Sequence, residues 1–346
     1  MGNDSSTSPP RSRGALAGVA AIGLAGAAIV YGTRSSAPNE PAPAQVAPPS
    51  ARASAPPSPS AAPEPLARVP APARLVAIGD LHGDLAATRA ALRLGGAIDE
   101  QDHWAGGDLV VVQTGDQLDR GDDERKILDL LERLSGEAKE KGGALHALNG
   151  NHEVMNVALD FRYVTDGGFS DFAGVPGALS SDPRLASLPE RARPRAAALL
   201  PGAPYAKLLA RRQTIAMVGD TLFVHGGVLP KHVAYGLARI NREVSAWMNG
   251  ESKSPPSIVT ADDAPIWTRR YSDNTGPDDC KALDEALAAA GAKRMVVGHT
   301  VQQRGINGGC GDKVWRIDVG LSHHYGGKPQ VLEIKGDAVK VLSAPQ

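Results

Sequence analysis

Three glycine-containing blocks near the start of the folded part hold side chains that could bind metal ions. The blocks are Gly79 to Asp84 (GDLHGD), Gly115 to Gly121 (GDQLDRG) and Gly150 to Glu153 (GNHE). Each follows a short apolar run typical of a buried strand, so we expect their polar side chains at one edge of a sheet. A mixture of carboxylates and imidazoles is typical of sites for Mn, Fe or Zn. It differs from the ligand sets of a thiolate zinc site and of an all-oxygen calcium loop. The pattern predicts a centre for two metal ions.

The order of the blocks suggests how the ligands divide between the two ions. Two ions about 4 Å apart need a bridging carboxylate and further ligands on each side. Asp116 is the expected bridge, because it lies between the first and third blocks. The expected ligands are Asp80, His82 and Asp116 for one ion, and Asp116, Asn151, His225 and His299 for the other. A turn beside glycine would explain each residue singly, but it would not explain six such residues after five predicted strands.

Together, these blocks resemble a known family. GDLHG, GDQLDRG, GNHE, HGG and GH are similar to the calcineurin-like metallophosphoesterase superfamily, and DRG and GNHE resemble its phosphoprotein phosphatase family. The segments PIWTR, VVGHT and WRIDVGLS resemble the bacterial Shewanella-like protein phosphatases. The long segment 155–212 departs from the eukaryotic pattern, and that family's C-terminal substrate-groove motif is missing from this sequence. The resemblance therefore does not imply a preference for phosphoserine or phosphothreonine.

The resemblance also implies roles for residues beside the ligands. It implies the same ligand set, with His152 as general acid and Asp119 as its partner. It implies Arg120 and Arg269 as clamps for the phosphate, and the neighbouring Arg270 is the alternative to Arg269. The chemistry agrees, because a leaving alkoxide needs a proton and a carboxylate can orient the imidazole that supplies it.

We therefore expect a dinuclear-metal-dependent phosphatase that hydrolyses phosphomonoesters by in-line attack of a metal-bridging hydroxide. The expected substrate is a phosphoprotein, on Ser/Thr or Tyr, or a small phosphoester. Manganese is the expected metal, with iron and zinc as alternatives. One alternative function is hydrolysis of dinucleoside polyphosphates or other nucleotides. The other is a non-catalytic, membrane-anchored metal-binding module, for which a general acid would have no use.

The pattern of apolar residues predicts an α/β fold. Short apolar runs alternate with amphipathic segments, of which Glu124 to Glu140 is the clearest, and this alternation favours a sandwich of two sheets flanked by helices. This is the αββα arrangement of metallophosphoesterases. Hairpins are expected at 214–224 and 331–342, the second of them completing the second sheet.

A weaker pattern between Val154 and Arg212 predicts a cap inserted over the metal edge. Arg191, Arg193 and Arg195 in this segment could meet a phosphorylated ligand, but a solvated helical face is the favoured interpretation. Histidines outside the glycine blocks are expected to be surface or core residues: His103, His146, His232, His323 and His324.

The first 73 residues differ in composition from the rest. Residues 1–14 are short and basic, and residues 15–32 hold no charge, which predicts a signal anchor or a cleaved signal peptide. Residues 33–73 are rich in Pro and Ala and predict a disordered linker, because 12 of the 27 prolines lie between Pro38 and Pro72. The metallophosphoesterase domain is expected at 74–346, membrane-anchored or exported outside the cytoplasm, in the periplasm if the source is bacterial.

Two further features bear on partners and compartment. The net charge of −1 argues against a nucleic-acid-binding protein, which would usually be strongly basic. Cys280 and Cys310 are the only cysteines. In an exported domain we expect them to form a disulfide, and otherwise two buried free thiols.

Overall fold

The computed structural model describes residues 66–273 and 275–344, and every element below lies in these ranges. The predicted anchor and most of the predicted linker lie outside them. Ordered structure begins before the expected boundary at Arg74, because Arg68–Val69 form strand β1, which pairs with a later strand. Arg68 also donates hydrogen bonds to the carbonyls of Gly219 and Gly291. Two residues among prolines are too short a segment to be recognised as a strand from sequence.

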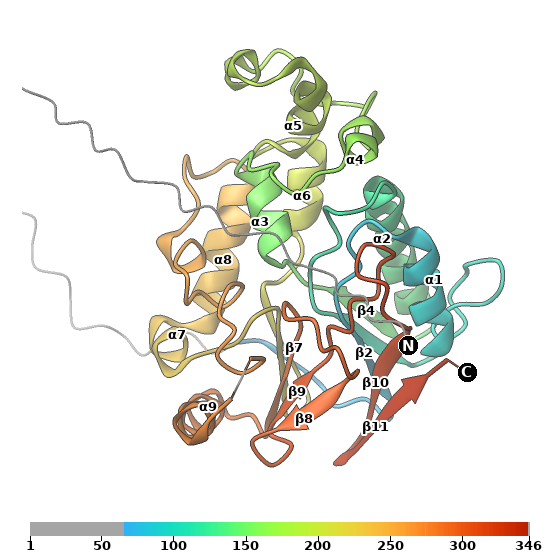
Figure 1. Cartoon of the computed structure of the whole chain (residues 1–346), viewed down its shortest axis with the longest axis vertical. Coiled ribbons are helices and arrows are strands. Elements are labelled where there is room, and N and C mark those ends of the chain that lie inside the picture. Colours follow the sequence, from blue (N-terminus) through green and yellow to red (C-terminus); the bar gives the residue numbers. More distant parts are fainter. Residues whose placement is uncertain (1–65, 274, 345–346) are drawn as a thin grey trace, which may run out of the picture. The chain divides into compact units, whose positions relative to one another are not determined.

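Two sheets form the centre of the fold (Figure 1). The five-stranded sheet has the order β11 (Ala338–Ser343), β10 (Gln330–Lys335), β2 (Leu75–Ile78), β3 (Val110–Gln113) and β4 (Ala144–Ala147). The six-stranded sheet has the order β1, β5 (Ile215–Val218), β6 (Thr221–Val224), β7 (Arg294–Val297), β9 (Val314–Arg316) and β8 (Asn307–Gly309). Strands β2, β3 and β4 are parallel, as are β6, β7 and β9. The predicted two-sheet α/β sandwich is confirmed.

Alternating side chains of the six-stranded sheet explain how the two sheets pack. Ala216 and Phe223 belong to the apolar core shared with the five-stranded sheet. Their neighbours Met217 and Leu222 belong to a second core, which packs on the outer helices. Successive residues of a strand point to opposite faces, so one sheet can take part in both cores.

Helices flank both sheets, as Figure 1 shows. The helices near the five-stranded sheet are α1 (Leu85–Leu94) and α2 (Glu124–Glu140). Those near the six-stranded sheet are α7 (Pro230–Tyr235), α8 (Leu237–Met248) and α9 (Pro277–Ala290). Helix α2 has the predicted bounds, and its apolar stripe, including Ile127, Leu131 and Leu134, is buried in the first core. Its C-cap residue is Lys141, which precedes Gly142, a glycine with positive φ.

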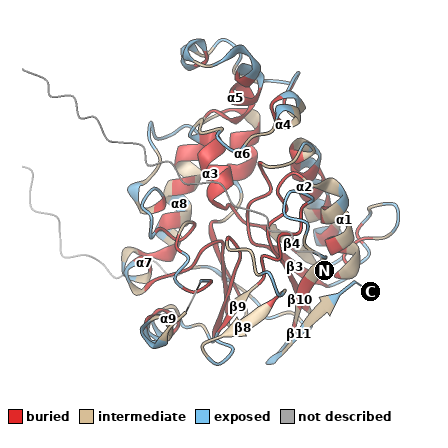
Figure 2. Ribbon diagram, in the orientation of Figure 1, coloured by how far each residue is buried: buried red, intermediate tan, exposed pale blue. Residues whose placement is uncertain are grey.

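The inserted segment consists of short helices, mostly above the sheets in Figure 1. They are α3 (Asn151–Val157), α4 (Asp166–Asp171), η1 (Pro183–Ser187), η2 (Glu190–Ala192), α5 (Arg193–Leu199) and α6 (Pro204–Ala210); a further turn, η3 (Ser257–Val259), lies after α8. Figure 2 shows that α3, α5 and α6 are largely buried, whereas η1 and its loops are exposed. Leu185, Ala196 and Leu200 form a small apolar cluster within this cap.

The last hairpin belongs to a different sheet from the one expected. Strands β10 and β11 do pair with each other, but β10 continues the five-stranded sheet by pairing antiparallel with β2. The ion pair between Arg74 and Glu333, 2.6 Å apart, joins these two strands. A hairpin signal is local in the sequence, whereas the edge on which the hairpin docks is decided by contacts far apart in the chain.

Cys280 and Cys310 form a disulfide that joins α9 to the end of β8. It closes a loop with a sequence separation of 30, and this loop contains His299. We expect the Cys280→Ser/Cys310→Ser variant to lose about 3 to 4 kcal/mol of unfolding free energy, because the bridge restricts the unfolded chain. Urea unfolding of both proteins measures this difference. A loss below about 1 kcal/mol would show that the bridge adds little to stability.

None of the helices in the described ranges is long and apolar enough to cross a membrane. Residues 15–32 are not part of those ranges, so the predicted anchor or signal peptide stays a prediction.

Candidate metal centre

Five strands deliver the predicted ligands to one place. Asp80 and His82 follow β2, and Asp116 follows β3 in the same sheet. Asn151 begins helix α3 after β4, while His225 and His299 follow β6 and β7 of the other sheet. All six are buried. Because these strands run parallel within their sheets, their carboxyl ends meet where the two sheets face each other.

Asp116 lies at the centre of this group. Two sets of side chains have ligand atoms within 4.8 Å of one another, and Asp116 belongs to both. One set adds His82 and His152, and the other adds His225 and His299. Asp116 Oδ2 lies 3.1 Å from His225 Nε2 and 3.7 Å from His82 Nε2. A carboxylate shared by two ligand sets is the arrangement that a pair of metal ions requires.

Backbone carbonyls orient three of the histidines. His82 Nδ1 lies 3.1 Å from the Leu118 carbonyl, and His225 Nδ1 lies 3.0 Å from the Thr114 carbonyl. The Nε2 atom of His299 lies 3.0 Å from the Trp267 carbonyl. A carbonyl can only accept, so in each ring this nitrogen carries the hydrogen and the other nitrogen faces the cluster.

The burial of these rings keeps two of them neutral. Burial lowers the pKa of His82 to about 3. Burial, together with His225 and Arg269, lowers the pKa of His299 to about 2. Both rings therefore present a lone pair towards Asp116 near neutral pH, which is the form that binds a metal ion.

The atoms that converge here are all acceptors, and this shows whether the site can hold a cation. His225 Nε2 lies 2.8 Å from Asn151 Oδ1 and 3.1 Å from His299 Nδ1. Because the hydrogen of His225 is on Nδ1, its Nε2 atom carries a lone pair. This lone pair faces the oxygen of Asn151 and the Nδ1 atom of His299. Such a set of acceptors is favourable only around a positive charge. The residues present fit a divalent cation with nitrogen and oxygen ligands.

Asp80 lies beside this set, with its carboxylate held by the opposite sheet. Its two oxygens accept from the backbone N–H of His299 at 3.3 and 3.1 Å, and Oδ2 lies 4.0 Å from His82 Nε2. Burial and the carboxylates of Asp318 and Asp116 raise the pKa of Asp80 well above its usual range. Asp318 also accepts from Gly320 N–H, so it both caps a turn and lies against the cluster.

His152 and Asp119 form a hydrogen-bonded pair. His152 Nδ1 lies 2.5 Å from Asp119 Oδ2, and His152 Nε2 faces the cluster, 3.7 Å from Asp116 Oδ2. Burial opposes protonation of this imidazole, but the carboxylates of Asp116 and Asp119 outweigh it and raise its pKa. The pair therefore has the geometry of an oriented, protonatable imidazole beside the cluster.

Glu153 organises the loop that carries Asp116, a role that the sequence analysis missed. Its carboxylate accepts four backbone N–H groups at 2.7 to 3.2 Å. The donors are Gly150, Asp116, Gln117 and Leu118. Glu153 is the third residue of α3, where an acidic side chain typically reaches back to cap the helix, so the sequence contained a signal for it.

The two predicted phosphate clamps differ in their surroundings. Arg120 lies between the rings of Tyr163 and Tyr325, at 4.5 and 5.4 Å from their centroids. It also lies beside His324, 3.4 Å away, so this histidine is at the mouth of the site and not an unrelated surface residue. Arg269 donates to the His299 carbonyl and the Thr300 hydroxyl at 2.7 and 2.9 Å.

Arg270, the alternative to Arg269, points elsewhere. It forms an ion pair with Asp279 of α9 at 2.7 Å. The structure thus brings Arg269, and not Arg270, against the backbone of a predicted ligand.

Backbone strain concentrates at these residues. Of the nine non-glycine residues with positive φ in the described ranges, five are predicted site residues: His82, Asp116, Asp119, Arg120 and His299. Residues other than glycine rarely have positive φ, and the residues that do so cluster at functional sites. Close packing adds a further constraint, because a Cβ atom at Gly150 would collide with the carboxylate of Asp116.

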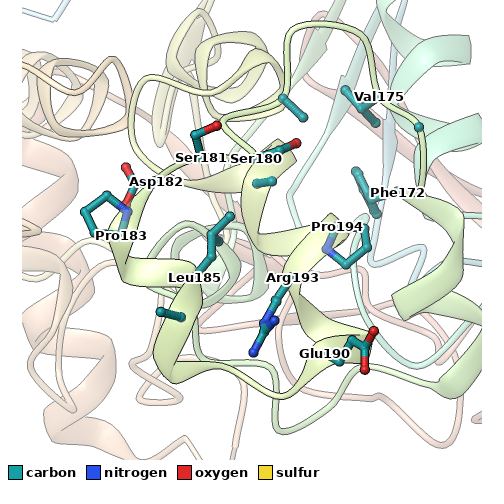
Figure 3. A pocket seen from close by; sticks show the side chains of 14 residues that line it. Phe172, Val175, Ser180, Ser181, Asp182, Pro183, Leu185, Glu190, Arg193 and Pro194 are labelled. Carbon is teal, nitrogen blue, oxygen red and sulfur yellow. The ribbon is translucent and has the colours of Figure 1, made fainter.

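Cavities lie in two relevant places. A cavity of about 420 Å³ opens beside His82, Arg120 and His324. Another, of about 660 Å³, lies in the cap and includes Leu185 and Arg193 in its lining (Figure 3). None of the predicted site residues lines the cap cavity, whereas His82 and Arg120 line the 420 Å³ cavity, which is therefore the candidate entrance to the cluster.

Comparison with known proteins agrees with this geometry. The family model of the calcineurin-like phosphoesterases matches residues 73–303. The chain belongs to this family. It is 45% identical over 308 residues to Shewanella-like protein phosphatase 2 of Arabidopsis thaliana, covering 79% of this chain and 78% of the relative. It is 28% identical to Shewanella-like protein phosphatase 1 of Plasmodium berghei, covering 78% of this chain and 74% of the relative.

A solved structure shows the same fold. The cold-active protein-tyrosine phosphatase of a psychrophilic Shewanella species matches with a TM-score of 0.63 and 22% identity, covering 81% of this chain and 83% of that one. As a calcineurin-like phosphoesterase, the protein is a metal-dependent phosphoester hydrolase.

Proposed function

We propose that this hydrolase is a dinuclear phosphomonoesterase that acts on phosphoproteins. The observation that carries the proposal is the hydrogen-bonded pair of His152 and Asp119 beside Asp116, which two ligand sets share. The proposed ligands are the six predicted ones: Asp80, His82, Asp116, Asn151, His225 and His299. Manganese is the proposed metal.

The protein's own groups perform defined parts of the reaction. Two divalent ions, when bound, supply a nucleophile at neutral pH and stabilise charge on the phosphoryl group. Arg120 and Arg269 hold the phosphate oxygens and orient phosphorus for in-line attack. His152 donates the proton from Nε2 to the leaving oxygen, and Asp119 keeps Nδ1–H pointing away from the substrate. Tyr163 and Tyr325, each 39% exposed, hold Arg120 at the entrance.

Phosphoprotein is favoured over nucleotide substrates for two reasons. The relatives above carry protein phosphatase in their names. The entrance also lies in an open part of the surface, between the loop before α2 and the loop after β9. Hydrolysis of dinucleoside polyphosphates is the alternative, because the same metal cluster could serve it.

The test compares substrates on the full chain loaded with Mn²⁺, Fe²⁺ or Zn²⁺. Phosphopeptides carrying phosphoserine, phosphothreonine or phosphotyrosine are measured against diadenosine tetraphosphate and p-nitrophenyl phosphate. We expect kcat/KM for at least one phosphopeptide to exceed that for the dinucleotide by about tenfold or more. A preference for diadenosine tetraphosphate would overturn the proposed substrate class and leave the metal chemistry intact.

Arg269 and Arg270 form a matched pair for testing the phosphate clamp. We expect Arg269→Ala to lower kcat/KM by about 10² to 10³, since it removes a cation from the developing charge of the phosphoryl group. Arg270→Ala removes a neighbouring arginine that points to α9, so we expect less than about a threefold change. Steady-state kinetics on p-nitrophenyl phosphate measure both. A larger loss for Arg270→Ala would reverse the assignment.

We further infer that residues 15–32 send the domain across a membrane, as an anchor or as a cleaved signal. The inference rests on 18 uncharged residues preceded by Arg11 and Arg13. Cell fractionation of the full chain with a C-terminal reporter tests this. A reporter found only in the cytoplasm would contradict it.

A further inference from the structure

Arg195 in the cap has a setting unlike the one expected from sequence. The interpretation as a solvated helical face is wrong for this residue, because its side chain is 0% exposed. The reason is that α5 turns this position inwards, towards α3, while Arg193 lies at the surface. Helix α5 contacts α3, and Figure 2 shows that much of α5 is buried. A guanidinium with no access to water must be held by several partners.

The partners of Arg195 come from four different segments. Nε donates to Asn156 Oδ1 and Nη1 donates to the Gly168 carbonyl, both at 2.8 Å. Nη2 is paired with the Glu124 carboxylate and lies 3.4 Å from Asp119 Oδ1. The guanidinium also lies 4.8 Å from the centroid of the Phe172 ring, which restricts its plane. One cap residue therefore ties α2, α3, α4 and the loop after β3 together.

Two of these contacts lead directly to the proposed general acid. Asp119 uses Oδ2 for His152, while its Oδ1 accepts from Asn156 Nδ2 at 3.0 Å and faces Arg195. Asn156 is itself oriented by Arg195, because the amide oxygen accepts from the guanidinium while the amide nitrogen donates to Asp119. The amide nitrogen also donates to the His152 carbonyl at 2.9 Å, so Asn156 contacts both members of the pair, and without Arg195 its buried amide oxygen would lose its donor.

We propose that Arg195 is the positioning residue of the general acid: it holds the Asp119 carboxylate and Asn156 so that His152 presents Nε2 to the leaving oxygen. The cap thereby completes the catalytic group without touching the substrate. The inference rests on the proposed function, since it assigns a purpose to the pair of His152 and Asp119. Lysine could not replace arginine here, because only the planar fork reaches Asn156, Glu124 and Asp119 at once.

The competing explanation is that Arg195 only stabilises the fold. Leaving-group dependence separates the two. An alkyl phosphate ester releases a strongly basic alkoxide that needs a proton, whereas p-nitrophenolate leaves without much help. A misplaced general acid therefore lowers the rate of hydrolysis of the alkyl ester selectively. A damaged fold or a lost metal ion lowers the rates for both substrates alike.

The variants are made in the full chain and loaded with Mn²⁺. Arg195→Lys keeps the charge and loses the fork. Arg195→Met/Glu124→Gln removes both members of the buried pair, so that no uncompensated charge is left between α2 and α5. Arg193→Met is the matched control on the same helix, because that side chain is exposed. His152→Gln shows what complete loss of the acid does.

We expect both Arg195 variants to lower kcat on an alkyl phosphate by about 10- to 100-fold, and kcat on p-nitrophenyl phosphate by less than about threefold. KM and metal content should stay near wild type, and Arg193→Met should change neither rate. For NMR the proteins are loaded with Zn²⁺, because paramagnetic Mn²⁺ would broaden nearby proton resonances. We expect the His152 Nδ1–H resonance at low field in the wild type, and it should shift or broaden in the Arg195 variants. If the double variant does not fold, Arg195→Lys carries the test.

Each of the following results would contradict the inference. Equal losses on both substrates, or no loss on either, would leave Arg195 with a structural role only. If the Arg195 variants lost kcat selectively on the alkyl phosphate but the His152 Nδ1–H resonance did not change, Arg195 would not act through the pair of His152 and Asp119. If His152→Gln itself showed no selective loss of kcat on the alkyl phosphate, His152 would not be the general acid, and the role of Arg195 would be excluded with it. If His152→Gln showed the selective loss and the Arg195 variants did not, only the role of Arg195 would be excluded.

Discussion

Asp116→Asn should abolish measurable turnover and the stabilisation of the protein by metal ions. Asp116 is the one residue that both ligand sets contain, so its replacement removes an anionic ligand from both ions at once. Metal ions contribute several kcal/mol of transition-state stabilisation, and each 1.36 kcal/mol is tenfold in rate, so we expect a loss of about 10³-fold or more.

The electrostatics of the cluster support so large an effect. Burial disfavours the charged form of Asp116, but in the absence of metal ions a proton on the His225 or His152 imidazole outweighs burial and holds the pKa of Asp116 well below its usual range. The carboxylate is therefore ionised and ready to bind cations at neutral pH. An asparagine at this position keeps the shape and removes the charge.

Metal content and the melting temperature with and without Mn²⁺ measure the result independently of activity. A ligand that binds only the native state raises the melting temperature, and this rise should disappear in Asp116→Asn. Asp108→Asn is the matched control, because Asp108 is exposed and precedes the same strand, β3. Retention of two ions with turnover near wild type would exclude Asp116 as the bridge.

His152→Gln should lower kcat on an alkyl phosphate by about 10² to 10⁴ while the protein keeps both metal ions. The imidazole lies 2.5 Å from Asp119 through Nδ1, which leaves only Nε2 to face the cluster. Glutamine keeps a polar side chain of similar reach, but it cannot donate a proton to a leaving alkoxide. On p-nitrophenyl phosphate the loss should be smaller, since that leaving group needs little protonation.

The same experiment decides between two roles for His152. Its ring belongs to one of the two ligand sets, together with His82 and Asp116. Loss of a metal ion in His152→Gln would assign it as a ligand and contradict the role as general acid. Asp119→Asn should show a loss of the same selectivity, and the two losses should not add, because the residues act as a unit. His103→Gln, an exposed histidine, serves as control.

Much of the candidate site could be predicted from sequence because it is built from local features. Each candidate ligand follows an apolar strand and stands beside glycine, and parallel strands bring their carboxyl ends together without further information. The glycines belong to the same short motifs, and at position 150 only glycine fits against the Asp116 carboxylate. Helix α2 was predictable with its bounds, because its apolar stripe and its glycine stop lie within one segment.

Contacts between distant segments could not be predicted in this way. The pairing of β10 with β2, the fit of Arg120 between Tyr163 and Tyr325, and the burial of Arg195 each join residues far apart in the chain. Three arginines spaced by two residues look like a solvated face, and only the packing of the cap on α3 separates the buried Arg195 from the exposed Arg193.

The sequence by itself thus determined the strands, the metal-binding residue types and the family, because these depend on residues close together in the chain. Only the tertiary structure decided which side chains share Asp116, which arginine faces His299 and which one lies behind the acid pair. The physical reason is that a side chain's charge and hydrogen bonds are settled by whatever packs against it, and packing partners are chosen by the whole fold.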